Sequence, residues 1–282
     1  MYEIVKEISS LNEYIDFIHD YRKNVKTELW YRGQRDNSWR LDATLNREKK
    51  MDIPILTPGE VATLKYKNIP NFGLELDEFK RKLSDIIPST YNKFHIMFLG
   101  QHYGLKTLAL DWSTDPLVAL FFALDGFKYV QGSFPVVFIL KPAKLNENSM
   151  ITNRDETPIC EPLNVDELSD SIFDEWFADV NNTPFSWVPL AVKSNFDISH
   201  RISRQSGVFT LMDTRQPFSH SWIQTHVDGE PFGITISINP TKVDDIRQHL
   251  ESLNITKETI YGNDHMEWDV ICEVIVRNTP KL

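Results

Sequence analysis

QHYGLKTLALDWSTDPLVALFFA, residues 101–123, places polar side chains directly before a segment that is apolar on almost every side. This segment predicts a buried helix, because a helix that is apolar all round belongs inside a domain. Ser113 or Thr114 is expected to cap its first turn, and Asp115 suits the positive end of its dipole. Alternating apolar residues at 108–112 predict a strand that runs into this cap. The junction therefore has free backbone N–H groups that can bind a ligand.

Periodicity and turn residues predict the other elements. Helices are expected at residues 10–24, 59–66 and 241–253, with two more between residues 76 and 98 that separate near Pro88. Strands are expected at residues 27–34, 134–140, 187–192, 207–212, 232–238 and 270–276. The chain shows no repeat and no linker, so residues 1–282 are expected to form one domain. Residues 146–180 are acidic and irregular, which predicts an insertion or a lid.

Composition restricts the function. The chain has 30 basic and 40 acidic residues, a net charge of -10, which argues against general affinity for phosphate backbones. Only Cys160 and Cys272 occur, so a disulfide framework and a zinc-ligand spacing are both missing. The first residues lack a signal-peptide core, and no apolar run approaches the roughly 18 to 20 residues that span a bilayer. We therefore expect a cytoplasmic protein that does not bind a membrane.

Tyr31, Arg32, Gly33 and Gln34 stand together at the end of a predicted strand. An arginine there can make two parallel hydrogen bonds to a phosphate or a carboxylate, and the glycine can let a ligand approach the backbone. The alternative is an ordinary ion pair between Arg32 and a nearby carboxylate.

Two further polar groups have two interpretations each. In HRISRQSGVF, residues 200–209, Arg201 and Gln205 either line a site or belong to a polar turn that enters a strand. His102 and Tyr103 either line a pocket or are partly buried residues bonded to backbone. The sequence contains no phosphate-binding P-loop, dinucleotide glycine fingerprint, HExxH or GxSxG motif.

These groups, in this order, resemble the FRG domain, a family named after an aromatic-Arg-Gly motif. The resemblance covers roughly residues 10–260 and rests on Tyr31-Arg32-Gly33-Gln34, Trp39, Leu45, Arg47, Gln101-His102-Tyr103-Gly104-Leu105, Thr107, Leu110-Asp111-Trp112-Ser113-Thr114, Pro116, Ala119, Leu120, Phe122 and Ala123, followed by Arg201, Gln205, Gly207 and Phe209. The chain departs from the family pattern in having Tyr31 for the usual Phe, Lys106 where Pro is frequent, and Leu108 where Arg often follows the Thr. The missing arginine leaves the partner of Asp111 open.

The order of parts is also similar, more distantly, to ADP-ribosyltransferases. That similarity implies an α+β fold with mixed or antiparallel central sheets and flanking helices, NAD as the cofactor and no metal. It implies that Arg32 holds NAD, that Ser113 or Thr114 supplies a supporting hydroxyl, and that Gln205 or Glu273 is the late catalytic residue. Glu267 and Glu161 are further candidates for that late position. The cofactor-binding set would be Tyr31, Arg32, Gly33, Gln34, His102, Tyr103, Asp111, Ser113 and Thr114, and the catalytic set Arg32, Gln205 and Glu273.

The resemblance implies a transferase that modifies a macromolecule, protein or nucleic acid, and acts as a bacterial toxin or antiphage effector with an antitoxin or regulatory protein as partner. One alternative is a non-catalytic sensing or protein-binding module in which Arg32, Asp111 and Gln205 hold a ligand. Another is a nuclease that uses Asp111, His102 and a metal ion. The first two differ in whether Arg32 and a late Gln or Glu share a pocket large enough for a dinucleotide.

Overall fold

The computed structural model describes residues 2–47, 72–85, 87–102, 104–149, 160–178, 188–212 and 222–262. The predicted helix at residues 59–66 and the predicted strand at residues 270–276 lie outside these ranges. In the described ranges no helix combines the length and the apolar character needed to cross a bilayer.

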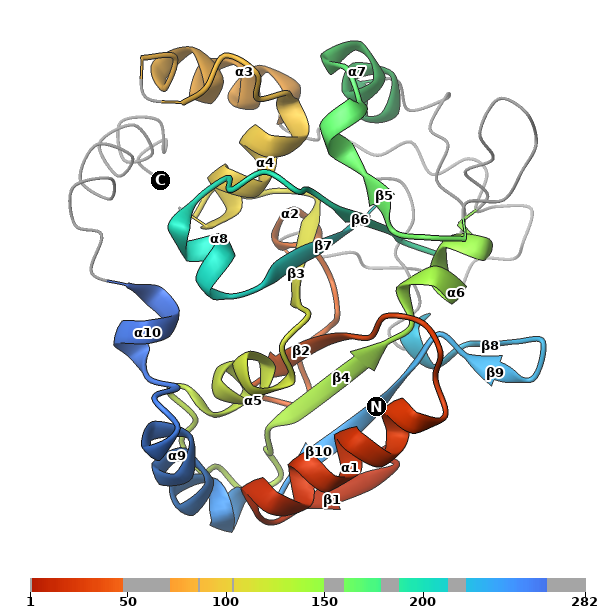
Figure 1. Cartoon of the computed structure of the whole chain (residues 1–282), viewed down its shortest axis with the longest axis vertical. Coiled ribbons are helices and arrows are strands. Elements are labelled where there is room, and N and C mark those ends of the chain that lie inside the picture. Colours follow the sequence, from red (N-terminus) through yellow and green to blue (C-terminus); the bar gives the residue numbers. More distant parts are fainter. Residues whose placement is uncertain are drawn as a thin grey trace.

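An eight-stranded sheet runs through the described part of the chain (Figure 1). Its order is β1 (Lys6–Ile8), β10 (Gly233–Ile238), β4 (Val136–Leu140), β2 (Trp30–Gln34), β3 (Ala109–Ser113), β7 (Gly207–Leu211), β6 (Leu190–Lys193) and β5 (Leu163–Asn164). The β1–β10 and β5–β6 pairs are parallel and the others are antiparallel. A small hairpin of β8 (His226–Val227) and β9 (Glu230–Pro231) lies apart from it. The fold is therefore α+β with a mixed central sheet, as expected.

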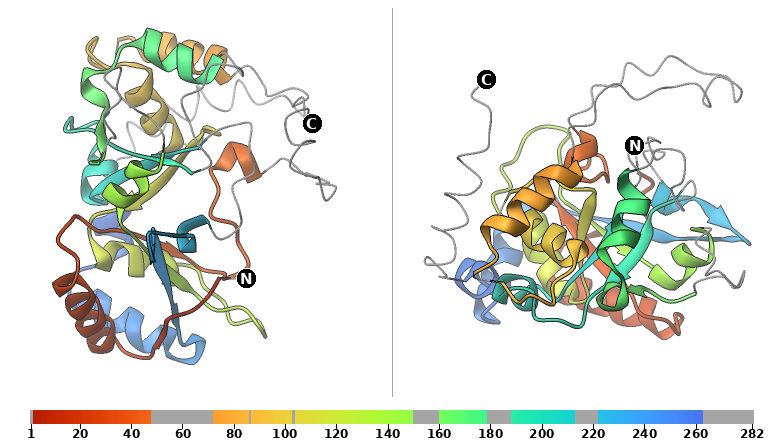
Figure 2. Two further views of the ribbon diagram at one scale, coloured as in Figure 1. Left: turned by 90° about the vertical axis from the view of Figure 1, so that its right-hand side faces the viewer. Right: turned by 90° about the horizontal axis from the view of Figure 1, so that it is seen from above.

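The helices divide between the two halves of this sheet. They are α1 (Leu11–Lys23), α2 (Thr44–Arg47), α3 (Phe72–Lys82), α4 (Lys93–His102), α5 (Pro116–Leu124), α6 (Pro142–Glu147), α7 (Asp170–Ala178), α8 (His200–Arg204), α9 (Val243–Ser252) and α10 (Lys257–Tyr261). Figure 2 shows α3, α4 and α7 at one end of the molecule and α1 with α9 at the other. Buried apolar residues of α1, α5 and α9 form one cluster with β2, β4 and β10, and those of α3, α4 and α7 form another with β3, β6 and β7.

Helix α5 begins differently from the prediction. Its N-cap is Asp115, whose carboxylate accepts a hydrogen bond of 2.8 Å from the backbone N–H of Leu117, and Pro116 occupies the first turn. The predicted caps, Ser113 and Thr114, are wrong because Ser113 is still the last residue of β3. The prediction of a buried helix is confirmed, since most of its residues are inaccessible to solvent.

Gly33 is where β2 and α5 meet. A Cβ atom at this position would lie 1.9 Å from the carbonyl oxygen of Ala119 and 2.4 Å from the backbone nitrogen of Ala123. The absence of a side chain therefore lets the strand backbone press against the helix backbone. The close contact between β2 and α5 explains why residue 33 is a glycine, so the expected approach of a ligand to the backbone is not needed as a reason.

Helix α4 is closed at both ends by local hydrogen bonds. At its start, Asn92 Oδ1 accepts from the backbone N–H of His95, and His95 Nδ1 accepts from the backbone N–H of Asn92. At its end, Gly104 has a positive φ of 89°. The backbone N–H of Gly104 donates a hydrogen bond to the backbone oxygen of Gln101, and that of Leu105 donates to the backbone oxygen of Gly100. This is the pattern of a glycine that terminates a helix, because other residues rarely adopt that conformation.

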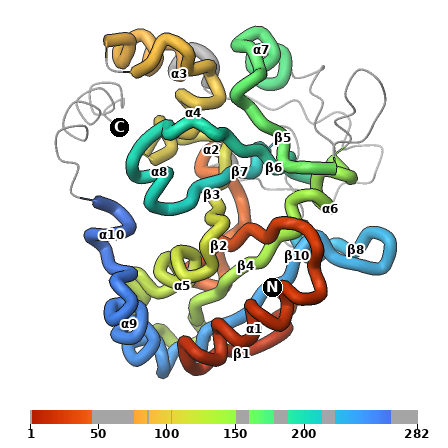
Figure 3. The backbone as a smooth tube through the Cα atoms, in the orientation of Figure 1, coloured from red at the N-terminus to blue at the C-terminus, as the bar shows by residue number. Residues whose placement is uncertain are grey.

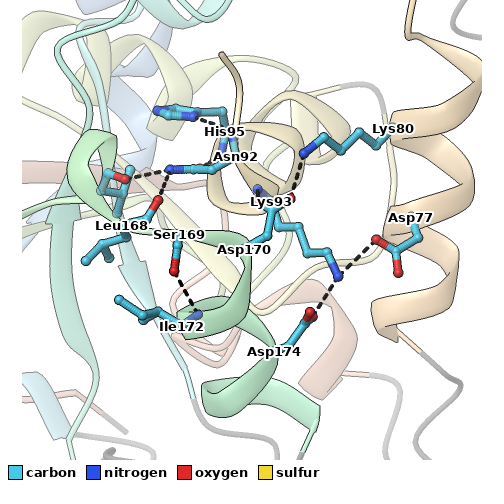
Figure 4. Close-up of polar contacts among 11 residues, drawn as sticks. Asp77, Lys80, Asn92, Lys93, His95, Leu168, Ser169, Asp170, Ile172 and Asp174 are labelled. Atoms are coloured by element: carbon cyan, nitrogen blue, oxygen red, sulfur yellow. Dashed lines mark hydrogen bonds and ion pairs between the residues drawn. The ribbon is translucent and has the colours of Figure 1, made fainter. Parts of the chain in front are cut away.

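Side-chain contacts join α4 to α3 and α7 (Figure 4). Lys93 Nζ lies 3.0 Å from Asp77 of α3 and 2.7 Å from Asp174 of α7, and Lys80 lies 2.8 Å from Asp170. Phe173 of α7 is fully buried in the cluster around α4. Residues 160–178 thus supply an edge strand and a core helix, and the expectation of an insertion or lid across 146–180 stays a prediction.

The structure also corrects one of the two interpretations of residues 200–209. His200–Arg204 form the short helix α8, capped by the Ser199 hydroxyl, where a polar turn was one expectation. The predicted strand that follows is present as β7.

Candidate functional site

A cavity of about 400 Å³ opens where β2 and β3 part from each other. In Figure 3 the traces of β2, β3, α5 and α8 come together near the centre of the molecule. The cavity volume lies within the range of roughly 300 to 1,000 Å³ that is typical of small-molecule sites. The lining residues are Tyr31, Arg32, Gly33, Gln34, Arg35, Trp39, His102, Asp111, Trp112, Ser113, Ala119, Phe122, Asp125, Gln205, Gly207 and Tyr261. We call this cavity the Arg32 pocket.

Arg32 bridges the two strands at their point of divergence. Among the described residues, β2 and β3 are in register at one pair, Tyr31 with Ser113. Arg32 Nη1 lies 2.8 Å from Asp111 Oδ2 and donates a hydrogen bond of 2.5 Å to the backbone oxygen of Asp111. The side chain of Arg32 is 12% exposed and that of Asp111 46% exposed. The carboxylate is therefore paired on one side and faces the cavity on the other.

Two more motif residues orient this carboxylate. Gln101 Nε2 donates a hydrogen bond of 2.9 Å to Asp111 Oδ1, and the hydroxyl of Thr107 donates to Gln101 Oε1. The partner of Asp111 that the sequence left open is thus Arg32, supported by Gln101. Arg32, Gln101, Thr107 and Asp111, from three of the resembling motifs, therefore form one connected network.

The network sets the charges in the pocket. Desolvation is the largest influence on Asp111 and opposes its ionisation, but the Arg32 guanidinium, His102 and a backbone hydrogen bond together outweigh it and lower the pKa of the carboxyl to about 2. Burial lowers the pKa of His102 to about 4, although the nearby Asp111 carboxylate acts in the opposite direction. At neutral pH the pocket therefore presents an ionised aspartate beside a neutral histidine.

Several buried polar atoms around the pocket have no hydrogen-bond partner among the described residues. They are Arg32 Nε, His102 Nε2 and both amide atoms of Gln34. Buried polar groups are nearly always paired in folded proteins, because an unpaired one costs free energy of folding. Their concentration beside one cavity indicates that the pocket accommodates a polar ligand or ordered water.

Ser113 and Gln205 lie in the pocket wall and are held by the protein itself. The Ser113 hydroxyl donates a hydrogen bond of 2.7 Å to the backbone oxygen of Gln205 and accepts one of 3.0 Å from the N–H of Asp115. Gln205 Nε2 donates a hydrogen bond of 3.3 Å to the backbone oxygen of Ile260. Arg32 and Gln205 therefore share one pocket, but the amide of Gln205 is turned towards α10.

Helix α10 closes one side of the pocket, which the sequence did not reveal. Arg201 Nη1 donates a hydrogen bond of 3.0 Å to the backbone oxygen of His102, and its guanidinium carbon lies 5.1 Å from the centre of the Tyr261 ring. The Tyr261 hydroxyl donates a hydrogen bond of 2.8 Å to Asp125. Burial, followed by the contact with Asp125, raises the pKa of Tyr261. Tyr261 and Asp125 are lining residues that sequence reasoning missed, because they meet only in the folded chain, and Phe122 was named there only as a motif residue.

The remaining expected site residues are elsewhere. Thr114 does not line the pocket, and Glu161 is exposed and also lies outside its lining. Tyr103, Glu267 and Glu273 lie outside the described residues. In the ranges that the structure describes, no three His, Cys, Asp or Glu side chains gather in a way that could hold a metal ion.

Comparison with known proteins identifies one family. Residues 27–129 match the family model described as FRG domain, which confirms the resemblance for the motifs between Tyr31 and Ala123. The match includes β2, β3 and α5, and it ends before Gln205 and α10. No curated protein and no solved structure matches the chain.

Proposed function

The chain carries an FRG domain at residues 27–129, and from its pocket we propose that the protein binds NAD and transfers ADP-ribose to a macromolecular target. The observation that carries this proposal is the Arg32 pocket itself. It joins an arginine, an ionised carboxylate and a late glutamine in one cavity, and unpartnered polar atoms surround it.

The pocket wall suits a nucleotide. Trp39, Phe122 and Tyr261 supply aromatic surface, on which a base can stack. Arg35 and Arg32 supply cationic groups of the kind that bind phosphate. Polar groups that fix orientation and apolar walls that exclude water together are typical of sites for small molecules and cofactors.

The chemistry of NAD suits the charge of the pocket. When the nicotinamide bond breaks, positive charge develops on the ribose that it leaves. An anion in a preorganised site stabilises such charge more in the transition state than in the ground state. Asp111 is ionised at neutral pH and is held in place by Arg32 and Gln101, so it is the described carboxylate best prepared for this role. Arg32 acts through its contact with Asp111 and through its Nε, which has no hydrogen-bond partner among the described residues.

One observation favours a second candidate, a ligand-sensing module without catalysis. The amide of Gln205 is bonded to Ile260 and the hydroxyl of Ser113 to Gln205, so two groups expected to act on the ligand are engaged by the protein. A glutamine also cannot act as a general base. In this candidate the same pocket binds the ligand, and the response passes to a partner protein.

The cellular role that we propose is that of a bacterial toxin or antiphage effector. The net charge of -10 favours a protein target, or a basic antitoxin or regulatory partner, over bare nucleic acid. A nucleic-acid acceptor would have to approach through a locally basic surface.

The decisive experiment measures nicotinamide release and transfer of labelled ADP-ribose from NAD in the presence of cell lysate. Wild type should show both activities and Arg32→Ala should lose both. Arg32→Ala also unpairs Asp111, so its melting temperature must be recorded alongside. Trp39→Ala provides a second variant, because Trp39 lines the pocket but is 42% exposed and its loss should leave the fold intact while weakening NAD binding.

Arg40→Ala is the matched control. Arg40 pairs with Asp42 at 2.7 Å in the same segment and does not line the pocket, so this variant should keep full activity; because Asp42 is buried, the melting temperature of Arg40→Ala is recorded as well. NAD binding without turnover would favour the sensing module. Absence of both binding and turnover in stable wild-type protein would overturn the assignment of NAD.

A further inference from the structure

Gln34 is the most unusual polar side chain in the described part of the protein. Only 3% of the residue is exposed, yet neither its amide nitrogen nor its amide oxygen has a hydrogen-bond partner among the described residues. Other glutamines that lie against the core differ: Gln101 donates to Asp111, and Gln205 donates to Ile260. Gln34 thus combines full burial with an unused donor and an unused acceptor.

The position of Gln34 on β2 places it in the wall of the Arg32 pocket. It is the last residue of β2, in register with Val136 of β4, so its backbone is held within the central sheet. It lines the Arg32 pocket. Arg32 lies two residues earlier on the same face of the strand, and its Nε is also unpartnered among the described residues. A rigid strand end therefore presents a donor from Arg32 next to a donor and an acceptor from Gln34.

We propose that Gln34 selects the ligand by pairing with a planar group that carries a hydrogen-bond donor beside an acceptor. A glutamine amide offers one N–H donor and one carbonyl acceptor side by side, so its best partner has the complementary pair. A primary carboxamide has this pattern, and so does the edge of adenine, which glutamine recognises through two hydrogen bonds in nucleic acids. This inference rests on the proposed function, because NAD contains both groups.

The competing explanation is an internal water molecule bonded to the Gln34 amide. Buried waters commonly satisfy polar groups that have no protein partner. Ligand recognition and water binding make opposite predictions for a variant that replaces the amide by an apolar side chain of similar length. Gln34→Met is such a variant.

The test measures the binding of NAD, ADP-ribose and nicotinamide by calorimetry, together with the melting temperature of the free protein. Gln34→Met should bind NAD about tenfold or more weakly, because it cannot form the paired hydrogen bonds. Its melting temperature should rise by roughly 2 °C or more, because the buried unpaired amide is gone. Gln248→Met, at an exposed position on α9, is the control and should change neither quantity.

The ligands distinguish the two sources of the donor–acceptor pair. Loss of ADP-ribose binding in Gln34→Met assigns the amide to adenine, and loss of nicotinamide binding assigns it to the carboxamide. Equal NAD affinity of wild type and Gln34→Met would overturn the role of Gln34 and leave the proposed function standing. A lower melting temperature in Gln34→Met would instead show that a structural water satisfies the amide, which would also overturn the inference.

If wild type fails to bind NAD, the proposed function fails and the role of Gln34 is decided by adenosine and nicotinamide alone. Binding of either compound that depends on Gln34 supports its role. Binding of neither overturns it.

Discussion

Asp111 shows how much of the candidate site depends on single contacts. Its carboxylate meets the Arg32 guanidinium at 2.8 Å and the Gln101 amide at 2.9 Å, and these contacts lie at the point where two strands separate. The Arg32–Asp111 ion pair thus holds β2 and β3 together and keeps Asp111 ionised in the pocket. Removing the charge without changing the size of the side chain separates these two effects.

Asp111→Asn is therefore expected to lower the free energy of unfolding by about 1 to 2 kcal/mol at neutral pH, an amount reduced by the partial exposure of the carboxylate. The folded-state pKa of Asp111, about 2, is below the ordinary value, so its contribution is complete above that ordinary value and is lost as the pH falls through 2. Denaturant unfolding at pH 7 and near pH 2 should show the difference between variant and wild type disappear in acid.

Asp20→Asn is the control for this prediction. Asp20 pairs with Lys23 on the surface of α1 at 2.9 Å, where solvent screens the interaction. Asp20→Asn should not measurably change the free energy of unfolding. An equal effect of the two substitutions would contradict the assignment of a special role to Asp111.

At the scale of elements, the contact between β2 and α5 holds the pocket in shape. Arg32 and Gln34 face the cavity from a strand whose intervening residue, Gly33, touches the backbone of α5 at Ala119 and Ala123. Small residues on both sides of the contact bring strand and helix close together. The glycine of the motif and the two alanines of the buried helix are thus parts of one packing contact, although they are far apart in the sequence.

Gly33→Ala is expected to be severely destabilising, by more than about 3 kcal/mol, because its Cβ would overlap backbone atoms that cannot move separately. Gly100→Ala is the matched control. A Cβ at Gly100 would lie 2.8 Å from the flexible end of the Leu105 side chain and 3.2 Å from Leu105 Cβ, so the loss should be smaller than at Gly33, and alanine favours the helix by about 1 kcal/mol. Thermal unfolding of both variants compares them, and a small loss for Gly33→Ala would show that α5 can shift away from β2.

At the scale of the whole molecule, His95 and His102, both with lowered pKa values, make stability depend on pH. His95 is fully buried near the start of α4, where burial lowers its pKa despite the contact of 2.9 Å between its Nε2 and Asp166. His102 lies at the end of the same helix and has a pKa of about 4. Both rings are therefore neutral in the folded protein at a pH where they would be protonated in the unfolded chain.

The free energy of unfolding should consequently fall as the pH is lowered from about 6.5 to about 4. In this window the unfolded chain binds more protons than the folded chain, so stability rises with pH. Urea unfolding at pH 7, 5.5 and 4.5 measures how steeply the free energy of unfolding changes with pH. His102→Gln should reduce this pH dependence in part, since His95 still contributes. A slope unchanged by His102→Gln would mean that His102 is accessible to protons in the folded state.

Local sequence patterns determined most of the elements around the pocket. Apolar alternation and helical periodicity depend on neighbouring residues, so α1, β2, α4, β3, α5, β4, β7 and α9 lie close to their predicted positions. The same patterns, with the ordered motifs, indicated the FRG domain that the family model matches at residues 27–129, and the pocket-lining residues Arg32, His102, Asp111 and Gln205.

Only the tertiary structure decided how these residues act on one another. It showed that Asp111 contacts Arg32 and Gln101. It also showed that the N-cap of α5 is Asp115 and that the Gln205 amide bonds Ile260. It also showed that Tyr261, near the end of the described chain, and Tyr31, near its start, line the same pocket. Hydrogen bonds and close packing act over a few ångströms in space, whereas sequence patterns report neighbours along the chain. Contacts between residues that are not neighbours along the chain therefore become visible only once the chain is folded.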